Sequence, residues 1–291
     1  MPATGDTKTL ASRFDARPIP GAPFGLEITA DLTASFSDSE KEELRRLYRQ
    51  DGLLLFRNQK LSMEQQIEAC SIFGPVLRDS IENYLVSNVE KDGLLGNREL
   101  LFHNDVPFVP APYLGGSLHA LEVDDGVSAT RFASAFRAWE ALPAEPQNRI
   151  DGLNVLHVRA RSFTRRTKLA DSEPRDNCAV HALVGRQEET GRPYIFACQD
   201  MAALVAGLSE EDSDALLEEL FGYLYAPGNV YEHHWQVGDF IVWDNLGVQH
   251  ARSEITGGRR TLQRVTIAEF GYWEQVPVDL QTYYDLQEQA D

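Results

Sequence analysis

The stretch that organises this sequence is Leu101-Phe-His-Asn-Asp-Val-Pro-Phe108, and its distant partner is Trp243-Asp-Asn-Leu-Gly-Val-Gln-His250. In an extended strand, residues i and i+2 point to the same face, so His103 and Asp105 can address one metal ion while Asn104 turns away. His250 is the natural third ligand. Two histidines and one carboxylate form the facial set that binds ferrous iron and leaves coordination positions open for chemistry.

Two arginines lie within reach of this group. Arg260 and Arg264 are four residues apart in an extended segment, so both guanidinium groups should share one face. We expect the Gly257-Gly258 turn to fold this strand back beside His250. Iron with one aspartate keeps a positive charge, so a chelating 2-oxo acid whose far carboxylate binds an arginine would complement the site.

Size and charge narrow the classes of partner. The 291 residues, 43% hydrophobic and 10% aromatic, are enough to bury a full core. The net charge of -18 argues against binding to nucleic acid or to an anionic membrane. We therefore expect a small-molecule substrate, and the sequence leaves the oligomeric state open, a homo-oligomer included.

Cysteines and the N-terminal residues indicate the compartment. Cys70, Cys178 and Cys198 form no CxxC pair, so we interpret them as reduced structural thiols. The first residues have no basic segment followed by an apolar run, and no stretch of about 18 apolar residues occurs. We expect a cytoplasmic protein.

The first hundred residues predict alternating strands and helices. Residues 25–29 alternate like a short strand, and 53–56 form an apolar run typical of a strand buried on both sides. Ser37-Asp-Ser-Glu40 is a capping box that opens one helix, and Ser62 with Gln65 opens another.

The middle of the chain predicts short strands and one helix. Strand signals lie at 84–86, around His103 and at 117–123, and residues 133–142 have helical spacing. Residues 160–178 are polar, of mixed charge and without a clear period. We interpret them as a long mobile loop and a candidate lid.

The last third predicts strands around one helix. Strands are expected at 179–184 and 194–197, joined by a hairpin at 189–192, and Ser209 with Asp212 should open a helix. Residues 239–243, the His250 strand and 260–270 should form a meander.

The pattern of short strands with segregated helices predicts a mainly β protein with α additions, built on a jelly-roll core, the double-stranded β-helix, flanked by helices. We expect one domain over 1–291. It would have a preface at 1–100, a core at 101–270 with an insertion at about 134–178, and a tail at 271–291.

In several short segments, including the His103, His250 and Arg260 stretches quoted above, the sequence resembles the TauD/TfdA family of Fe(II)- and 2-oxoglutarate-dependent dioxygenases. The matching pieces keep the family's order along nearly the whole chain. They are Gly25-Leu-Glu-Ile with Asp31-Leu32, Leu53–Phe56, Phe73-Gly-Pro75, His103-x-Asp105, Thr130-Arg-Phe-Ala-Ser134, Val180-His-Ala-Leu183, Thr190-Gly-Arg192, Gly238-Asp239, Trp243-Asp-Asn245, His250 and Arg260-Thr-Leu-Gln-Arg264.

The resemblance implies that His103, Asp105 and His250 bind Fe(II). It also implies that Thr130 and Arg260 hold the distal carboxylate of 2-oxoglutarate, and that Arg264 lies near the metal-bound carboxylate. By the same resemblance, O2 and 2-oxoglutarate would be consumed, succinate and CO2 released, and a substrate C–H bond hydroxylated. Halogenating relatives lack the carboxylate, so Asp105 favours hydroxylation, with desaturation and ring closure as related outcomes.

Departures from the family bear on the substrate. The family's Trp-His-Thr-Asp is Phe102-His-Asn-Asp here, and residues 75–84 lack the histidine that sulfonate-using members carry, which argues against taurine. Our candidates for the substrate pocket, together with the 160–178 loop, are Arg78, Asn83, Tyr84, Asn104 and Phe108.

Two other classes of function use the same residues. A zinc hydrolase could hold an activated water on His103, Asp105 and His250, but it would leave Thr130 and both arginines without a role. A binding protein without catalysis should have lost a ligand or an arginine, and none is lost.

The other histidines and two of the tryptophans are expected to have structural roles. Adjacent strand residues point to opposite faces, so His233 and His234 should not chelate one ion. Core or supporting roles are expected of the remaining candidates, which are His119, His157, His181, Trp235 and Trp243.

Overall fold

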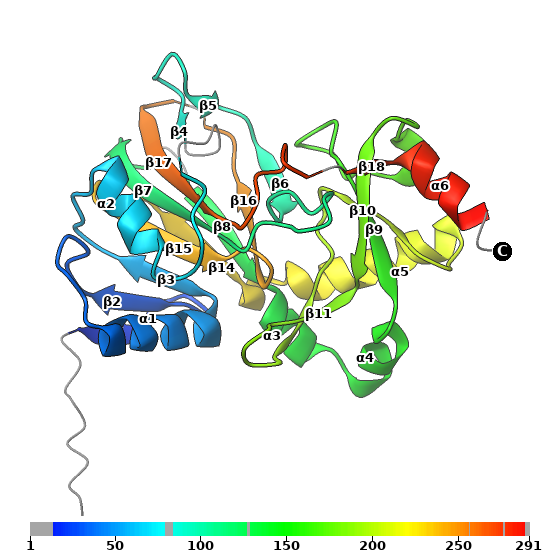
Figure 1. Cartoon of the computed structure of the whole chain (residues 1–291), viewed down its shortest axis with the longest axis horizontal. Coiled ribbons are helices and arrows are strands. Elements are labelled where there is room, and N and C mark those ends of the chain that lie inside the picture. Colours follow the sequence, from blue (N-terminus) through cyan, green and yellow to red (C-terminus); the bar gives the residue numbers. More distant parts are fainter. Residues whose placement is uncertain (1–13, 79–83, 127–128, 256, 276, 289–291) are drawn as a thin grey trace, which may run out of the picture.

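The computed structural model describes residues 14–78, 84–126, 129–255, 257–275 and 277–288. One half of the molecule is a pair of facing sheets with α1 and α2 on its outer side, and the other half carries β9, β10 and helices α4 to α6 (Figure 1). This mainly β arrangement with a jelly-roll core confirms the predicted fold class.

The larger core sheet has eight strands. It extends the expected jelly-roll sheet with strands from the N-terminal hundred residues, so the preface is hydrogen-bonded into the core. Its spatial order is β1 (Asp15–Pro18), β2 (Leu26–Thr29), β3 (Leu53–Phe56), β15 (Phe240–Asp244), β7 (Gly115–Val123), β17 (Arg260–Ile267), β4 (Leu85–Ser87) and β5 (Leu94–Leu95).

The smaller core sheet has four strands and carries two of the predicted metal ligands. Its spatial order is β14 (Val230–His234), β8 (Ala129–Ser134), β16 (Val248–Arg252) and β6 (Leu100–His103). β16 lies between β8 and β6 and pairs antiparallel with both.

The β3 strand shows why the larger sheet is buried on both faces. Leu53 and Leu55 point between the two sheets and pack with Trp243 and Phe132, whereas Leu54 and Phe56 face the opposite way. All four side chains are inaccessible to solvent. The continuous apolar run therefore predicted this strand correctly.

Two capped helices cover the outer face of that sheet. Helix α1 (Asp38–Asp51) begins after Ser37 and α2 (Met63–Cys70) after Ser62, and both have complete capping boxes, as predicted. Leu44 and Leu47 of α1 and Ile67 of α2 pack in one cluster with the outward side chains of the sheet.

The segment between β8 and β14 builds the second half of the molecule. Its elements run to Leu224, well beyond the end expected near residue 178. They are α3 (Ala135–Ala141), α4 (Ala144–Ile150), β9 (Asn154–Val158), η1 (Leu169–Asp171), β10 (Asn177–Ala182), β11 (Val184–Arg186), β12 (Pro193–Ile195), β13 (Ala202–Val205) and α5 (Glu210–Leu224), followed by η2 (Pro227–Asn229).

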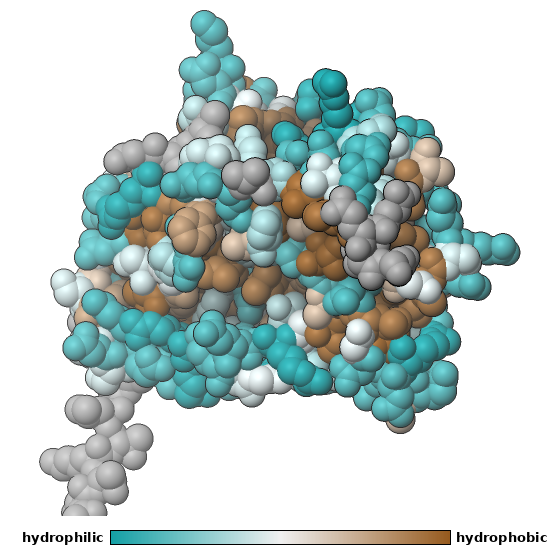
Figure 2. All heavy atoms as spheres, turned by 45° about the vertical axis from the view of Figure 1, so that its right-hand side comes forward, coloured by the Kyte–Doolittle hydropathy of each residue, from teal (hydrophilic) through white to brown (hydrophobic). Residues whose placement is uncertain are grey.

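The C-terminal tail is part of this second half. β18 (Val278–Asp279) pairs with β10 at the edge of the β13-β9-β10-β18 sheet, and α6 (Leu280–Glu288) follows it. On the side of the molecule that carries β9 and β10, apolar side chains lie exposed in patches between hydrophilic ones (Figure 2).

The predicted meander is wrong. β15 and β17 belong to the larger sheet, where both pair with β7, while β16 belongs to the smaller sheet. The chain therefore crosses between facing sheets at each connection, and β17 does not pair with the His250 strand. The Gly257-Gly258 turn is a local signal, and it carried no information about which sheet the next strand joins.

The 160–178 loop is tied down by ion pairs. Arg161 binds Asp176 and Glu173, each at 2.7 Å, while Arg166 and Lys168 bind Asp214 of α5 at 2.7 and 2.8 Å. The last two residues of the predicted loop, 177 and 178, already belong to β10.

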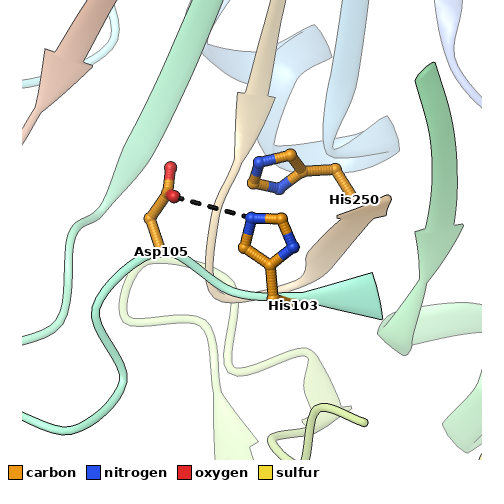
Figure 3. A group of neighbouring side chains, drawn as sticks. All are labelled: His103, Asp105 and His250. Atoms are coloured by element: carbon orange, nitrogen blue, oxygen red, sulfur yellow. Dashed lines mark ion pairs between the residues drawn. The ribbon is translucent and has the colours of Figure 1, made fainter. Parts of the chain in front are cut away.

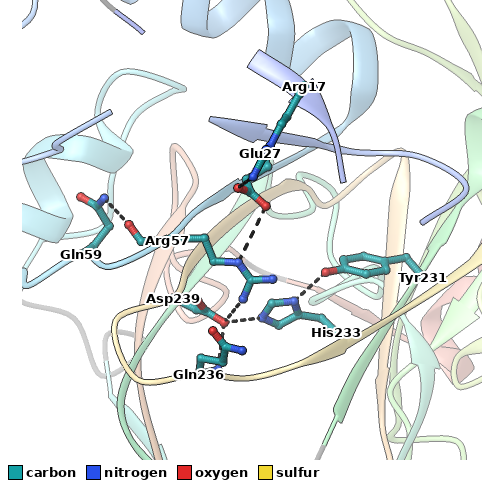
Figure 4. A network of polar contacts seen from close by, with 8 residues as sticks. All are labelled: Arg17, Glu27, Arg57, Gln59, Tyr231, His233, Gln236 and Asp239. Carbon is teal, nitrogen blue, oxygen red and sulfur yellow. Dashed lines mark hydrogen bonds and ion pairs between the residues drawn. The ribbon is translucent and has the colours of Figure 1, made fainter. Parts of the chain in front are cut away.

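A buried polar network joins β14 to the residues next to the ends of β3 and β15 (Figure 4). Asp239 accepts one hydrogen bond from Arg57 (2.7 Å) and pairs with His233 (3.0 Å), whose other nitrogen contacts the Tyr231 hydroxyl (2.7 Å). His234 points out to solvent. The prediction that this histidine pair does not chelate an ion is consistent with these opposite directions.

No helix in the described part of the chain is both long and apolar enough to cross a lipid bilayer.

Candidate active site

His103 and His250 are direct cross-strand partners. The last residue of β6, His103, pairs with His250 near the centre of β16, so both side chains project from the same face of the sheet. Their rings lie 4.1 Å apart between centroids. Gly247, just before β16, lets this strand pack against α3, because a Cβ at that position would fall 2.0 Å from the ring of Phe136.

Asp105 completes the group from the loop that follows β6 (Figure 3). One ligand atom from each of His103, Asp105 and His250 lies within 4.8 Å of the other two, and His103 Nε2 is 3.9 Å from Asp105 Oδ1. Among the described residues, this is the only group of histidine, cysteine and carboxylate side chains with such spacing. The structure thus brings together the three residues that the sequence proposed.

Hydrogen bonding orients the imidazole of His103, and burial keeps that of His250 uncharged. His103 Nδ1 lies 2.8 Å from the Leu101 carbonyl oxygen, so it can donate there and leave Nε2 free to bind an ion. Burial, and then the nearby His103, lower the pKa of His250 to about 3. His250 is therefore uncharged at neutral pH.

Asn245 fixes the backbone of Asp105, a role that the sequence reasoning missed. Its Oδ1 accepts a hydrogen bond from the Asp105 N–H (2.7 Å), and its Nδ2 donates to the carbonyl oxygens of Asp105 (3.1 Å) and Tyr113 (2.8 Å). The next residue, Val106, has φ of 55°, a strained conformation for a β-branched side chain. Asn245 lies in the quoted Trp243-Asp-Asn245 motif, which was its only signal.

Arg264 reaches Asp105 from the opposite sheet. Its Nη2 lies 2.7 Å from Asp105 Oδ2. Burial alone would raise the pKa of Asp105, but Arg264, His250 and His103 outweigh it and lower the pKa below its ordinary value. Asp105 is therefore a carboxylate at neutral pH, with its other oxygen directed at His103.

Arg260 is a buried cation without a carboxylate partner. Its side chain is 1% exposed, and Nε and Nη1 have no hydrogen-bond partner among the described residues. Its Nη2 lies 3.5 Å from Thr130 Oγ1, which accepts a hydrogen bond from Trp235 Nε1 (2.9 Å). Burial, and then Arg252, lower the pKa of Arg260 to about 9, so it still carries its charge at neutral pH.

These groups surround one cavity of about 310 Å³. Thr130, Arg260 and Arg264 all line it, together with the three candidate ligands, so the predicted shared face of the two arginines is confirmed. Arg252 also lines it, and the sequence reasoning missed this residue although it follows His250 by two positions in a strand. The volume is at the lower end of small-molecule pockets.

The candidates for the substrate pocket divide into three sets. Asn104 and Phe108 line the cavity, although the Asn104 amide is already bonded to the Asn245 carbonyl oxygen (2.5 Å). Arg78 lies on the surface, paired with Glu64 at 3.0 Å, and Tyr84 is exposed, so neither is part of the described wall. Asn83 lies outside the described residues.

The remaining histidines and tryptophans take the expected roles. His119 and His157 are buried, and His181 Nε2 contacts the Pro107 carbonyl oxygen at 2.9 Å. Trp235 is buried. Trp243 is buried too, but it lines the cavity and packs its ring 4.8 Å from that of His250.

Comparisons with known proteins identify the family. The taurine catabolism dioxygenase TauD, TfdA family matches residues 15–266. The α-ketoglutarate-dependent 2,4-dichlorophenoxyacetate dioxygenase of Cupriavidus pinatubonensis is 31% identical over 265 residues, which cover 81% of this chain and 91% of that protein. Pentalenolactone F synthase of Streptomyces arenae is 27% identical over 286 residues, which cover 88% and 96%.

Solved structures match with similar coverage. AAD-2 in complex with Mn(II) and N-oxalylglycine superposes with a TM-score of 0.74 at 25% identity, covering 89% of this chain and 98% of that one. A taurine dioxygenase from Burkholderia xenovorans has a TM-score of 0.73 at 23% identity, covering 92% and 94%, and this likeness shows the fold.

Proposed function

Since this chain belongs to the TauD, TfdA family and is an α-ketoglutarate-dependent dioxygenase, we propose that it oxidises a small organic substrate at Fe(II) held by His103, Asp105 and His250. The carrying observation is the convergence of these three side chains in a cavity that also holds an unpaired buried arginine.

The donor set suits ferrous iron. Two neutral imidazoles and one carboxylate on one side of an ion are typical of non-haem Fe(II) oxygenases. The carboxylate of Asp105 is kept in place by Arg264 and by the grip of Asn245 on its backbone. These residues would keep the ligands in position before the ion binds, so little reorganisation is required.

The other end of the cavity suits the distal carboxylate of 2-oxoglutarate. Burying a guanidinium group without a partner is costly, and a carboxylate that binds Arg260 and the Thr130 hydroxyl would remove that cost. Arg264 lies between this end and Asp105, where it can also meet the carboxylate next to the metal. Iron with 2-oxoglutarate and O2 would supply the oxidising power that yields succinate, CO2 and a hydroxylated C–H bond.

Two features bear on the outcome and the substrate class. Asp105 occupies the position that halogenating relatives leave vacant, which favours hydroxylation, while pentalenolactone F synthase among the relatives keeps ring closure and desaturation within the proposal. The names of the relatives include dioxygenases of phenoxy acids, so small carboxylic acids head the list of substrates to be tested. A zinc hydrolase would leave Thr130 and Arg260 unused, and we do not favour it.

We place the protein in the cytoplasm within this proposal, because Cys70, Cys178 and Cys198 are free and buried thiols. The whole chain is proposed to act as one dioxygenase domain, with the 160–178 loop as a lid that its ion pairs hold over the cavity. Ala160 and Phe163 at the start of that loop line the cavity wall, which supports this role.

The test combines a binding signal with turnover. Anaerobic protein loaded with Fe(II) and 2-oxoglutarate should develop a weak visible metal-to-ligand charge-transfer band, and a screen of small acids, amino acids and alcohols should find a compound that releases succinate stoichiometrically. His234→Ala, which changes an exposed histidine, is the matched control and should behave as wild type. Fully metal-loaded wild type without the band would refute the proposal.

A further inference from the structure

Asp200 is a buried acid on the cavity wall that the reaction described above does not use. It lies between β12 and β13, its side chain is 3% exposed, and it lines the same cavity as the candidate metal ligands. Its backbone is fixed from two sides, because its N–H donates to the Phe102 carbonyl (3.2 Å) and its carbonyl accepts from the Thr167 N–H (3.1 Å). The carboxyl group is therefore held at a defined place beside His103.

No hydrogen bond or ion pair to this carboxyl group occurs in the described part of the protein. Its Oδ1 is fully buried and accepts no hydrogen bond. Burial raises the pKa of Asp200 to about 6, and the nearby His103 only partly offsets this rise. Two other buried acids behave differently: Asp244 accepts hydrogen bonds from Gln187, Leu246 and Gly247, and Asp239 pairs with Arg57 and His233. Folding normally pairs such groups, so an unpaired acid on a cavity wall indicates a partner that arrives with a ligand.

The residues around Asp200 indicate further properties of that ligand. Met201, Phe108 and Tyr272 form apolar wall around it. Arg159 directly follows the last residue of β9, Val158. The Val158 N–H donates to the carbonyl of Met201 (2.9 Å), the residue after Asp200, so Arg159 and Asp200 lie on neighbouring segments. The Arg159 guanidinium lies over the rings of Phe108 (5.6 Å) and Tyr272 (5.9 Å), and no ion pair joins it to Asp200 in the described structure.

We propose that Asp200 is a substrate-positioning residue that accepts a hydrogen bond from a hydroxyl or amino group of the substrate, while Arg159 at the cavity mouth binds an anionic group of the same molecule. The substrate is thus a small, largely apolar hydroxy acid or amino acid. This inference rests on the proposed dioxygenase function, because it assigns the substrate side of that site.

The test uses three probes with one skeleton. Mandelate, phenylglycine and 2-phenylpropionate share the ring and the carboxylate and differ only in carrying a hydroxyl, an ammonium or a methyl group. Each is titrated into anaerobic protein with Fe(II) and 2-oxoglutarate while the charge-transfer band is followed. The band before addition tests the proposed function, whereas the probe-dependent change in it tests this inference.

A probe with a donor should bind about tenfold to a hundredfold more tightly than 2-phenylpropionate, the range expected for a hydrogen bond to a charged group. Asp200→Ala should abolish that preference. Asp200→Asn should reduce it for both donors and more strongly for phenylglycine, since the amide oxygen still accepts a hydrogen bond but has no charge to attract the ammonium group. Arg159→Gln should weaken all three probes alike. No binding by any probe, equal binding of all three, or a preference that survives in Asp200→Ala would overturn the proposal.

A second measurement needs neither metal nor substrate. Asp200→Asn should leave the melting temperature of the metal-free protein unchanged or raise it, because the carboxylate has no partner to lose. The matched variant Asp244→Asn should lower it, since an amide donor would then face Gln187. A loss in Asp200→Asn as large as that in Asp244→Asn would show that Asp200 is paired within the fold and would overturn the proposal.

Discussion

Replacing Arg260 by Ala separates binding of 2-oxoglutarate from stability of the fold. The wild-type guanidinium is 1% exposed, and two of its nitrogens have no partner in the described structure. Its charge should therefore gain a full partner only when the cosubstrate binds. A hydrogen bond to a charged group contributes about 1.5–3 kcal/mol, so the variant should need about tenfold to a hundredfold more 2-oxoglutarate.

Stability should respond differently from affinity. Removing an unpaired buried cation relieves a desolvation cost, which offsets the packing lost with the side chain. We expect the free energy of unfolding of the metal-free variant to lie within about 1–2 kcal/mol of wild type.

The assay measures succinate release against 2-oxoglutarate concentration, together with urea unfolding of each protein. Arg259→Ala is the matched control, because Arg259 is the next residue in the chain but lies exposed and pairs with Glu122 on the surface. An unaltered 2-oxoglutarate requirement in Arg260→Ala would refute the assignment of Arg260. A loss of unfolding free energy far above that range would refute the claim that the cation is unpaired in the empty protein.

The remaining predictions concern the acid ligand, its support and Asp200. Asp105→Ala should abolish succinate formation and leave Arg264 without its 2.7 Å partner, and unchanged turnover would remove Asp105 from the site. Asn245→Ala removes three hydrogen bonds and should cost about 3 kcal/mol in urea unfolding, with about tenfold to a hundredfold weaker metal binding; normal metal affinity would contradict its supporting role. Burial raises the pKa of Asp200 from 3.8 to about 6. Ionisation of Asp200 should therefore leave the free energy of unfolding unchanged below about pH 3.8 and lower it progressively between pH 3.8 and 6. Above pH 6 the loss should be constant, at most about 3 kcal/mol. Asp200→Asn should remove this pH dependence, and parallel stability curves for the two proteins would contradict it.

Local patterns in the sequence predicted local structure well. The capping boxes at Ser37 and Ser62 fixed the starts of two helices, because they depend only on contacts within four residues. The run at 53–56 predicted a strand buried on both faces. His103 and Asp105 could be assigned together because a spacing of two in an extended segment sets their common direction.

Non-local pairing explains what the sequence could not show. The strands of His250 and Arg260 are adjacent along the chain but belong to facing sheets, and no turn residue specifies this. The arginines nevertheless reach the metal site, because the interior between two sheets is shared by both. Arg78 was expected near the pocket, but its side chain lies on the surface and pairs with Glu64. The residues next to it in the sequence do not indicate that direction.

Asp200 and Arg252 show a further limit of sequence reasoning. Asp200 lies in a stretch without a recognisable motif, and the spacing of Arg252 from His250 indicates only a shared face of the strand, so the burial of both charges is known only from the structure. Asp200 lacks a partner, while Arg252 donates to the carbonyls of Leu95 and Arg98 and keeps one nitrogen unpaired in the described structure. Whether a buried charge has a partner is a property of the folded chain.

Anaerobic equilibrium dialysis against Fe(II) measures whether His103, Asp105 and His250 bind one metal ion together. Wild type and His234→Ala should bind one iron per chain, and His250→Ala should bind almost none at the same free iron concentration. Full retention of iron by His250→Ala would contradict this shared site.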